Sequence, residues 1–258
     1  MAMFDIKDIL DRNFTSITDT YAKFACDKSQ CKRCSVFEAY KQIVQSDGNA
    51  KNPTFMIIGE SAGNDEIEQV RPFVGRAGQR LRQELRKYKD VFNRNTTIIT
   101  NVLPCRPRNN VFPRDSDGPY TVHDGPHDGH LVKARDLVSF CATNWLYREI
   151  NLLQPKIIIT LGSKALGCVR GDTGITSNRG SWKFINSFRA WSFATYHPSY
   201  VLRCENSEDK FYIVEDFESD IKKIAETWSS IVLDDERLNM PMKEWKKSLM
   251  MSRHDRIL

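Results

Sequence analysis

Four short runs of apolar, mostly β-branched residues divide the chain into a repeating pattern of strands and helices. The first three runs are almost continuously apolar, which is typical of parallel strands that helices cover on both faces. The alternation therefore predicts an α/β fold with a parallel sheet between two helical layers. The expected strands are Thr54–Gly59, Thr96–Asn101, Lys156–Leu161 and Ser192–Tyr196, and the expected helices are Ala77–Tyr88, Lys133–Leu153, Lys164–Val169 and Val214–Trp228.

Polar residues stand where each expected strand ends. Glu60 comes directly after the first strand, and Asn101 closes the second. Ser163 follows the third strand, and His197 follows the fourth. Ligands of open α/β sheets bind beyond the carboxyl ends of the strands. The pattern therefore predicts a pocket lined by Glu60, Asn101 and His197.

Three parts of the chain stand apart from this alternation. Residues 106–135 are rich in Pro, Gly, Asp and His and lack periodicity, so we expect a long loop on the surface of the domain. We expect residues 1–25 to form a helical N-terminal extension and residues 231–258 to form a basic C-terminal extension. Residues 26–230 are then the expected single domain, with the loop inserted in it.

The composition narrows the class of protein. With 258 residues, 40% hydrophobic and 28% charged, the chain is that of an ordinary soluble globular protein. No apolar run approaches the ~20 residues that span a bilayer, and the N-terminus lacks the pattern of a signal peptide. We therefore expect no membrane association and a cytoplasmic location, with the nucleoid or in the host cytoplasm if the protein is viral. The net charge of +5 favours a polyanionic partner.

Seven cysteines are many for a reducing compartment, where they favour metal ligation over disulfides. Cys31 and Cys34 form a C-x2-C pair, which suits two thiolates on one metal centre. Together with Cys105 and Cys141 they would fit either a tetrahedral zinc ion or a cubane iron–sulfur cluster, and the spacing does not choose between them. Alternatively, Cys105 and Cys141 are small buried residues of the core. Cys26 is the one substitute ligand nearby.

Seven segments carry motifs in a fixed order, namely CKRC, GESAGNDE, RPFVGRAGQRL, ITNVLPCRPRN, KIIITLGSKAL, ITSNRGSW and TYHPSYVLR. In order and local spacing they resemble the family 4 uracil-DNA glycosylases, the iron–sulfur branch of the uracil-DNA glycosylase superfamily. The resemblance implies a three-layer α/β/α sandwich with a central four-stranded parallel sheet, and an enzyme that hydrolyses the N-glycosidic bond of uracil in DNA. It also implies a structural [4Fe–4S] cluster, whose ligands match Cys31, Cys34, Cys105 and Cys141.

The resemblance also implies how the pocket would read a base that is flipped out of the DNA stack. Phe73 matches the aromatic floor on which uracil stacks, and the backbone amides of Ser61 and Ala62 are candidate base contacts. The Asn101 amide can donate to uracil O4 and accept from N3–H, whereas cytosine presents the reverse pattern. His197 matches the histidine that hydrogen-bonds uracil O2 as negative charge develops on the leaving base.

Two acids and four surface residues complete the implied site. The reaction needs a carboxylate to stabilise the cationic sugar and to orient or deprotonate water. Glu60 and Glu66 both match acids of the family, and the sequence does not rank them. The implied DNA contacts are Ser163 and Ser199 at phosphates, Leu202 as a wedge in the vacated stack, and Arg203 at a phosphate.

Two features depart from the family pattern. The segment between the third and fourth matched cysteines holds 35 residues, more than is usual in the family. It carries His123, His127 and His130, which suit a DNA-facing or partner-binding loop, or else a second metal site. Pro104 stands where the family commonly has a basic residue.

Three other functions stay open. The insertion and the basic tail suit a catalytically weak superfamily member that serves as a DNA-binding or replication-accessory subunit. A glycosylase for another deaminated or modified base, or a zinc-ribbon binding protein, would share parts of the pattern. The full set of pocket residues favours the enzyme, since a scaffold has no need of it; that set is Glu60, Glu66, Phe73, Asn101 and His197.

Overall fold

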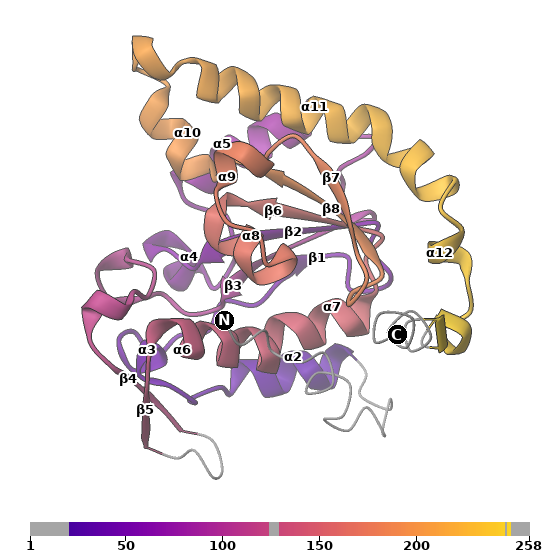
Figure 1. Cartoon of the computed structure of the whole chain (residues 1–258). Coiled ribbons are helices and arrows are strands. Elements are labelled where there is room, and N and C mark those ends of the chain that lie inside the picture. The colour runs from indigo at the N-terminus through magenta and orange to yellow at the C-terminus, as the bar shows by residue number, and fades with distance from the viewer. Residues whose placement is uncertain (1–20, 124–128, 246, 249–258) are drawn as a thin grey trace, which may run out of the picture.

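The computed structural model describes residues 21–123, 129–245 and 247–248, and its centre is a six-stranded sheet between two layers of helices (Figure 1). Most of the expected N-terminal extension, His127 and the last ten residues lie outside these ranges. The strands, in their order across the sheet, are β1 (Asp47–Gly48), β3 (Thr97–Leu103), β2 (Phe55–Ser61), β6 (Ile157–Leu161), β8 (Ala190–Thr195) and β7 (Trp182–Ile185).

The four strands that the apolar runs predict lie at the centre of this sheet and are mutually parallel. The α/β class is therefore confirmed, but the sheet has six strands rather than the four that the resemblance implies. The two additional strands, β1 and β7, pair antiparallel at the two edges. Edge strands are short and half-exposed, so β1, with two residues, and β7, with a mixed burial pattern, have no continuous apolar run to reveal them.

The alternation of side chains along the strands builds a core on each face of the sheet. In β2, Met56 and Ile58 belong to one core, whereas Phe55 and Ile57 belong to the other. The first core is covered by α2 (Tyr21–Ser29), α6 (Ala134–Cys141), α7 (Tyr147–Leu153) and α8 (Gly162–Arg170), with a π-helical turn at Ala142–Leu146 between α6 and α7. The second is covered by α5 (Arg76–Arg86), α10 (Pro198–Cys204) and α11 (Tyr212–Leu233).

All four expected helices are present, and short helices complete the described chain. None of the described helices is long and apolar enough to cross a bilayer. The short α-helices are α3 (Ser35–Glu38), α4 (Asn64–Gln69), α9 (Ile175–Asn178) and α12 (Glu236–Asn239), and the 3-10 turns are Arg108–Asn110, Asp115–Asp117 and Glu208–Lys210.

The inserted segment is more ordered than the sequence predicts. Instead of one long loop, it includes a two-stranded antiparallel hairpin of β4 (Tyr120–Val122) and β5 (His130–Val132). The hairpin packs on the C-x2-C segment, since the His123 N–H donates to the Arg33 carbonyl over 2.8 Å and Val122 forms a bridge with Cys34. Strands of three residues carry too little periodicity to be recognised in a Gly- and Asp-rich stretch.

The chain after α11 returns to the β7 edge of the sheet (Figure 1). The ring of Trp245 packs against that of Phe184 with centroids 5.9 Å apart, and Arg189 Nε donates to the Arg237 carbonyl over 2.7 Å. The first part of the expected C-terminal extension is thus in contact with the sheet. The domain boundaries at residues 26 and 230 stay a prediction.

Candidate active site

The carboxyl ends of three parallel strands bring together the polar residues that follow them in the sequence. Glu60 lies near the end of β2, Asn101 lies in β3, and His197 comes two residues after β8. All three line a cavity of about 280 Å³. Four further expected residues line the same cavity, namely Ser61, Glu66, Phe73 and Ser199, whereas Ala62, Ser163, Leu202 and Arg203 do not.

The aromatic ring of Phe73 and the amide of Asn101 converge above Gly59. Phe73 is 3% exposed and Asn101 is 5% exposed. A Cβ atom at position 59 would collide with Asn101 Oδ1 and would lie 2.5 Å from Phe73 Cζ. Glycine at this position therefore allows the ring and the amide to approach the strand end together.

The backbone of Phe73 is held in a left-handed conformation with φ of +55°. For a bulky residue this costs about 1–3 kcal/mol and requires the surroundings to fix it. The Phe73 N–H donates to Glu66 Oε1, and the Phe73 carbonyl accepts from Arg82 Nε over 3.1 Å. Arg82 also donates to the Pro72 carbonyl over 3.2 Å. Two side chains thus clamp both sides of the Phe73 peptide.

Both carboxylate oxygens of Glu66 are engaged with backbone amides. Oε1 accepts from the Phe73 N–H, and Oε2 accepts from the Gly63 N–H over 2.7 Å. Burial raises the pKa of Glu66, and these two amides oppose the increase. The Glu66 carboxylate thus holds the loop that carries Phe73.

Glu60 is the carboxylate that lies beside the histidine. A Cβ atom at Gly162 would stand 2.7 Å from Glu60 Oε1 and 2.9 Å from His197 Cβ. Because glycine has no Cβ, both side chains have room to approach this position. Gly162 also has a φ of +85°, which favours glycine. Burial raises the pKa of Glu60, while the Lys164 N–H and the charges of Lys164 and Arg203 lower it.

The tautomer of His197 is set by the helix that it caps, and its charge is set by burial. It is the N-cap of α10, and its Nδ1 accepts from the Ser199 N–H over 3.2 Å. An accepting Nδ1 in a neutral imidazole places the proton on Nε2, which is then a donor. Burial, and secondarily the charge of Arg203, lowers the pKa of His197 to about 4. The ring is therefore neutral near pH 7.

The Asn101 side chain carries an NH2 group without an acceptor. Its Nδ2 is buried and makes no hydrogen bond with any residue that the structure describes. A buried unsatisfied donor costs about 1–3 kcal/mol. Because Asn101 lines the cavity, a ligand with a carbonyl group would relieve this cost.

The inserted segment contributes two residues to the cavity that the sequence analysis does not single out. Asn110 and Phe112 line it, and the Lys164 ammonium lies 5.6 Å from the centre of the Phe112 ring. Asn109 and Asn110 are both left-handed, with φ of +56° and +57°. Asparagine is enriched in this conformation, so the Asn-Asn pair is the signal that marks a sharp turn here.

The residues expected at DNA lie on two helices that start beside the cavity. Ser163 is exposed in the first turn of α8. Leu202 and Arg203 lie on α10, half-buried and exposed respectively, and the Arg203 guanidinium stands 5.7 Å from the Tyr200 ring. Ala62 differs from them, since it is fully buried and its N–H donates to the Leu103 carbonyl over 3.3 Å.

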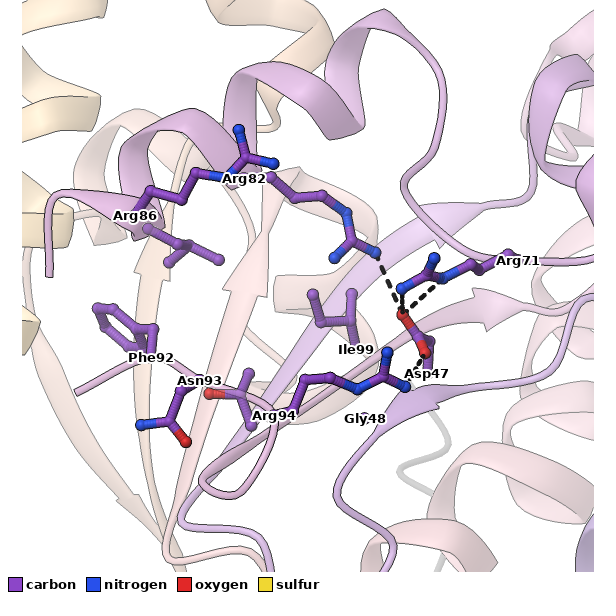
Figure 2. Close-up of a pocket in the computed structure, with 11 residues that line it drawn as sticks. Asp47, Gly48, Arg71, Arg82, Arg86, Phe92, Asn93, Arg94 and Ile99 are labelled. Atoms are coloured by element: carbon purple, nitrogen blue, oxygen red, sulfur yellow. Dashed lines mark hydrogen bonds and ion pairs between the residues drawn. The ribbon is translucent and has the colours of Figure 1, made fainter. Parts of the chain in front are cut away.

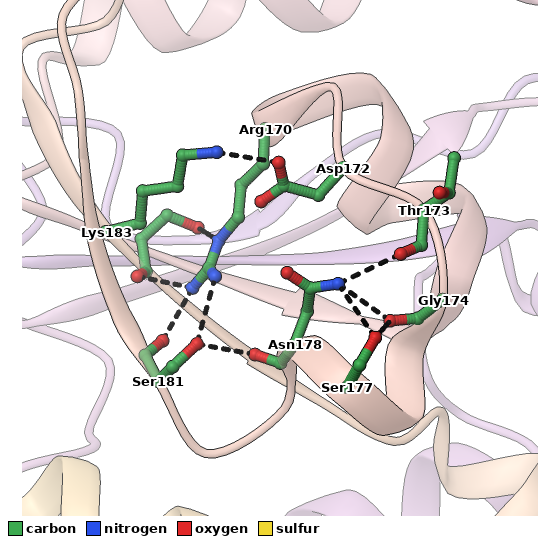
Figure 3. Close-up of polar contacts among 9 residues, drawn as sticks. Arg170, Asp172, Thr173, Gly174, Ser177, Asn178, Ser181 and Lys183 are labelled. Carbon is green, nitrogen blue, oxygen red and sulfur yellow. Dashed lines mark hydrogen bonds and ion pairs between the residues drawn. The ribbon is translucent and has the colours of Figure 1, made fainter.

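The motif ITSNRGSW belongs to a polar network around the Arg170 guanidinium (Figure 3). Arg170, at the end of α8, donates to the Ser192 carbonyl over 2.6 Å and to the Ser181 carbonyl over 2.7 Å. Burial lowers the pKa of Arg170 to about 10, which leaves it charged. Asn178 Nδ2 donates to the carbonyls of Thr173 and Gly174, each over 2.9 Å. The network ties α8 and α9 to β8, the strand that leads to His197.

The four cysteines that match the cluster ligands come from three segments and are all buried on one face of the sheet. Their exposures are 8%, 7%, 5% and 8% for Cys31, Cys34, Cys105 and Cys141. Burial raises the pKa of Cys105 and Cys141, and the negative charge of neighbouring thiolates raises both further. The four thiols therefore lie within electrostatic reach of one another. Cys26 is exposed.

The chemistry of the donor set fits a metal centre that thiolates hold. A tetrahedral zinc ion needs sulfur atoms ~3.8 Å apart, because each Zn–S bond is about 2.3 Å. Among the described residues, no three His, Cys, Asp or Glu side chains are grouped closely enough to hold one metal ion. Four buried thiols whose charges raise one another's pKa fit a centre held by four thiolates, and a [4Fe–4S] cluster is such a centre. The His123 imidazole lies 3.3 Å from the Glu38 carboxylate.

Comparison with known proteins agrees with this geometry. Residues 45–218, which include the whole central sheet and the cavity residues, match the family model of the "Uracil DNA glycosylase superfamily". The chain belongs to this superfamily. The family assignment accounts for the position of the cavity, at the carboxyl ends of the parallel strands of an α/β fold.

Several curated relatives are about 30% identical to this member of the superfamily over the aligned residues. A type-4 uracil-DNA glycosylase of Sulfurisphaera tokodaii is 30% identical over 216 residues, which cover 81% of this chain and 84% of that protein. The type-4 uracil-DNA glycosylase of Thermotoga maritima is 31% identical over 192 residues, covering 73% and 86%. That of Pyrobaculum aerophilum is 32% identical over 180 residues, covering 67% and 80%.

Proposed function

We propose that this protein is a uracil-DNA glycosylase, a repair enzyme that hydrolyses the N-glycosidic bond of uracil in DNA and leaves an abasic site. The observation that carries the proposal is the buried, unsatisfied NH2 group of Asn101 beside the Phe73 ring in a cavity of about 280 Å³. The relatives named type-4 uracil-DNA glycosylase support the same reaction.

Recognition of the base rests on Phe73 and Asn101. A uracil flipped into the cavity stacks on the Phe73 ring, while Asn101 Nδ2 donates to O4 and Oδ1 accepts from N3–H. Cytosine presents an amino group and an unprotonated ring nitrogen at these two positions. It leaves buried polar groups unpaired, at about 1–3 kcal/mol for each. The pocket therefore discriminates against cytosine through the free-energy cost of leaving buried polar groups unpaired.

The leaving base is stabilised by His197. As the C–N bond breaks, negative charge develops on the uracil ring and its O2 becomes a stronger acceptor. The Nε2–H of a neutral His197 donates to O2, and the Ser199 amide fixes the ring that carries this proton. A preorganised donor of this kind is worth about 3–4 kcal/mol in the transition state.

Glu60 is the carboxylate that faces the sugar and the attacking water. Its negative charge stabilises the oxocarbenium-like sugar, and one oxygen can orient the water. Glu66 has the different role of holding the Phe73 loop, because both of its oxygens accept backbone amides. This assignment ranks the two acids that the sequence leaves equal. Ser61 lines the same cavity, and its backbone amide would be a further base contact.

Cys31, Cys34, Cys105 and Cys141 would hold a [4Fe–4S] cluster, for which all four are buried on one face of the sheet. When bound, the cluster would join three separate segments through covalent Fe–S bonds and so fix the loops around it. One of these segments, which carries Cys34, also supports the inserted hairpin.

The DNA strand lies across α8 and α10. Ser163 and Ser199 can donate to phosphates next to the flipped nucleotide, Arg203 can pair with a phosphate, and Leu202 can fill the vacated place in the stack. An enzyme of this kind acts in the compartment that holds the DNA. In a cell without a nucleus, this compartment is the cytoplasm.

The proposal is tested with a labelled single-stranded oligonucleotide that carries one uracil, incubated with iron-loaded protein and then treated with alkali. Matched oligonucleotides with thymine or cytosine at that position, and the His197→Ala protein, are the controls. Cleavage at uracil alone, lost or greatly slowed in the variant, supports the glycosylase. If cluster-loaded protein binds the DNA without cutting it, the enzyme hypothesis fails and an accessory DNA-binding subunit replaces it.

A further inference from the structure

A second cavity lies at the β1 edge of the sheet and is surrounded by arginines (Figure 2). It has a volume of about 180 Å³ and is distinct from the cavity that contains Asn101. Arg82 and Arg86 come from successive turns of α5, and Arg71 and Arg94 come from the segments after α4 and before β3. The amino-terminal half of β3 contributes Ile99 to the apolar lining.

One carboxylate stands among these four guanidinium groups. Asp47 accepts from Arg71 over 2.9 Å and from Arg82 over 3.3 Å at Oδ2, and from Arg94 over 3.3 Å at Oδ1. Figure 2 shows these three side chains converging on Asp47. Arg86 lines the cavity and makes no ion pair with any residue that the structure describes. Four positive charges thus surround a single negative one.

The donors in this cavity exceed the acceptors that the protein supplies. Each guanidinium carries five N–H groups, and the two oxygens of Asp47 can accept only a few of them. Asp47 is 17% exposed, whereas Arg71 and Arg94 are 46% and 77% exposed, so their remaining donors are accessible to solvent. Convergent arginines that keep free donors are suited to phosphate, whose oxygens accept bidentate hydrogen bonds.

We propose that this arginine cavity binds a phosphate group. The phosphate would share Arg71 and Arg94 with Asp47 and would engage Arg86, and the excess of positive charge would hold it. Binding here does not depend on the proposed glycosylase reaction. Two sources have the same chemistry, namely a phosphodiester of a DNA strand away from the flipped base, and a small free phosphate compound.

The test measures two kinds of binding on the full-length, iron-loaded protein. Calorimetry at low ionic strength follows the binding of inorganic phosphate. Separately, the affinity for a thymine-only single-stranded oligonucleotide is measured as a function of salt concentration, so that no excision takes part. The variants are Arg86→Gln and Arg94→Gln, whose side chains are exposed. The control is Lys89→Gln, which removes the same charge from an exposed neighbour that does not line the cavity.

We expect inorganic phosphate to bind the wild-type protein and the Lys89 variant alike, and to bind each arginine variant at least about fivefold more weakly. If the source is DNA, the slope of log affinity against log salt concentration also becomes less steep by ~0.7 in each arginine variant. This is the value for one lost phosphate contact on a single strand. An unchanged slope with weakened phosphate binding assigns the cavity to a free phosphate compound. Undetectable phosphate binding with equal slopes, or an equal loss in the Lys89 variant, overturns the proposal.

A fourth variant tests the same inference in the opposite direction. Asp47→Asn removes the internal anion that competes for the arginines, so inorganic phosphate should bind several-fold more tightly to it. Weaker phosphate binding by a variant that still melts cooperatively would contradict the proposal, because the cavity would then need Asp47 to keep its shape.

Discussion

The Arg82 side chain holds the main chain of Phe73, since Arg82 Nε donates to the Phe73 carbonyl over 3.1 Å. Phe73 has a φ of +55°, so its ring reaches the cavity only while the surrounding contacts maintain a strained peptide. Arg82 is in turn paired with Asp47 on the edge strand β1. The position of the aromatic floor thus depends on residues that lie outside the cavity.

Replacement of Arg82 by Gln should loosen the Phe73 loop and impair excision mainly through KM, because the ring would no longer be fixed for stacking. We expect kcat/KM for uracil-containing DNA to fall by about tenfold, which corresponds to about 1.4 kcal/mol. Lys89→Gln removes the same charge from an exposed residue that follows α5 and makes no contact with Phe73. This control should keep kcat/KM within about twofold of the wild-type value. Equal losses in the two variants would assign the effect to charge alone.

Substitution of Gly59 by Ala tests the convergence of Phe73 and Asn101. The added methyl group would collide with both side chains, so we expect excision to fall by more than about 10²-fold and stability to decrease by about 1–3 kcal/mol. Gly167→Ala in α8 is the matched control. Its Cβ would meet no heavy atom closer than 3.8 Å, and alanine favours a helix, so activity and melting temperature should not decrease.

The exchange Asn101→Asp separates recognition from folding. A carboxylate keeps the shape of the amide but offers an acceptor to uracil O4 in place of a donor, so kcat/KM for uracil should fall by about 10²-fold or more. The control is Asn186→Asp, which makes the same exchange at an exposed position in the β7–β8 turn. Full activity of the Asn101 variant would mean that the base is read by other groups.

His197 should give a signature in the pH dependence of stability. Its pKa is about 4 in the folded protein, whereas an unfolded chain has the ordinary value of 6.5, so the unfolded state binds the proton more readily. Folding is therefore weakened as the pH falls from 6.5 toward 4, by up to about 3 kcal/mol. The His197→Asn variant keeps an N-cap acceptor but cannot titrate. The difference in unfolding free energy between wild type and variant should change across this window and be constant above pH 7.

The proposed cluster ligands are tested one at a time by Cys→Ser exchange. Each of Cys31, Cys34, Cys105 and Cys141 should be required for iron binding, so each variant should lose the visible absorbance and most of the about four iron atoms per chain. Cys204→Ser, at a buried position in the other core, should retain both. Retention of iron by two or more of the four ligand variants would disprove this assignment.

The sheet and the position of the cavity can be predicted from the sequence because both depend on local patterns. Continuous apolar runs mark the four central strands, and parallel strands place Glu60, Asn101 and His197 at one edge. The edge strands are different. β1 has only two residues, and its pairing with β3 depends on a neighbour that is distant in sequence.

The proposed ranking of the acids and the arginine contacts rest on tertiary structure, which local sequence patterns do not reveal. The sequence does not rank Glu60 and Glu66, and the structure distinguishes them because the amides of Gly63 and Phe73 converge on Glu66. Likewise, Asp47 and Arg82 are 35 residues apart and meet only when α5 packs beside β1. Such contacts depend on how the elements pack, and no sequence motif predicts them.

The most direct test of the central claim is the chemical identity of the product. Single-stranded DNA with one uracil is incubated with iron-loaded wild-type protein, and free uracil and abasic sites are counted in the same reaction. The account predicts equal amounts of the two, both reduced by at least about 10²-fold in the His197→Ala protein. Absence of free uracil from a reaction in which the same protein binds the DNA would contradict it.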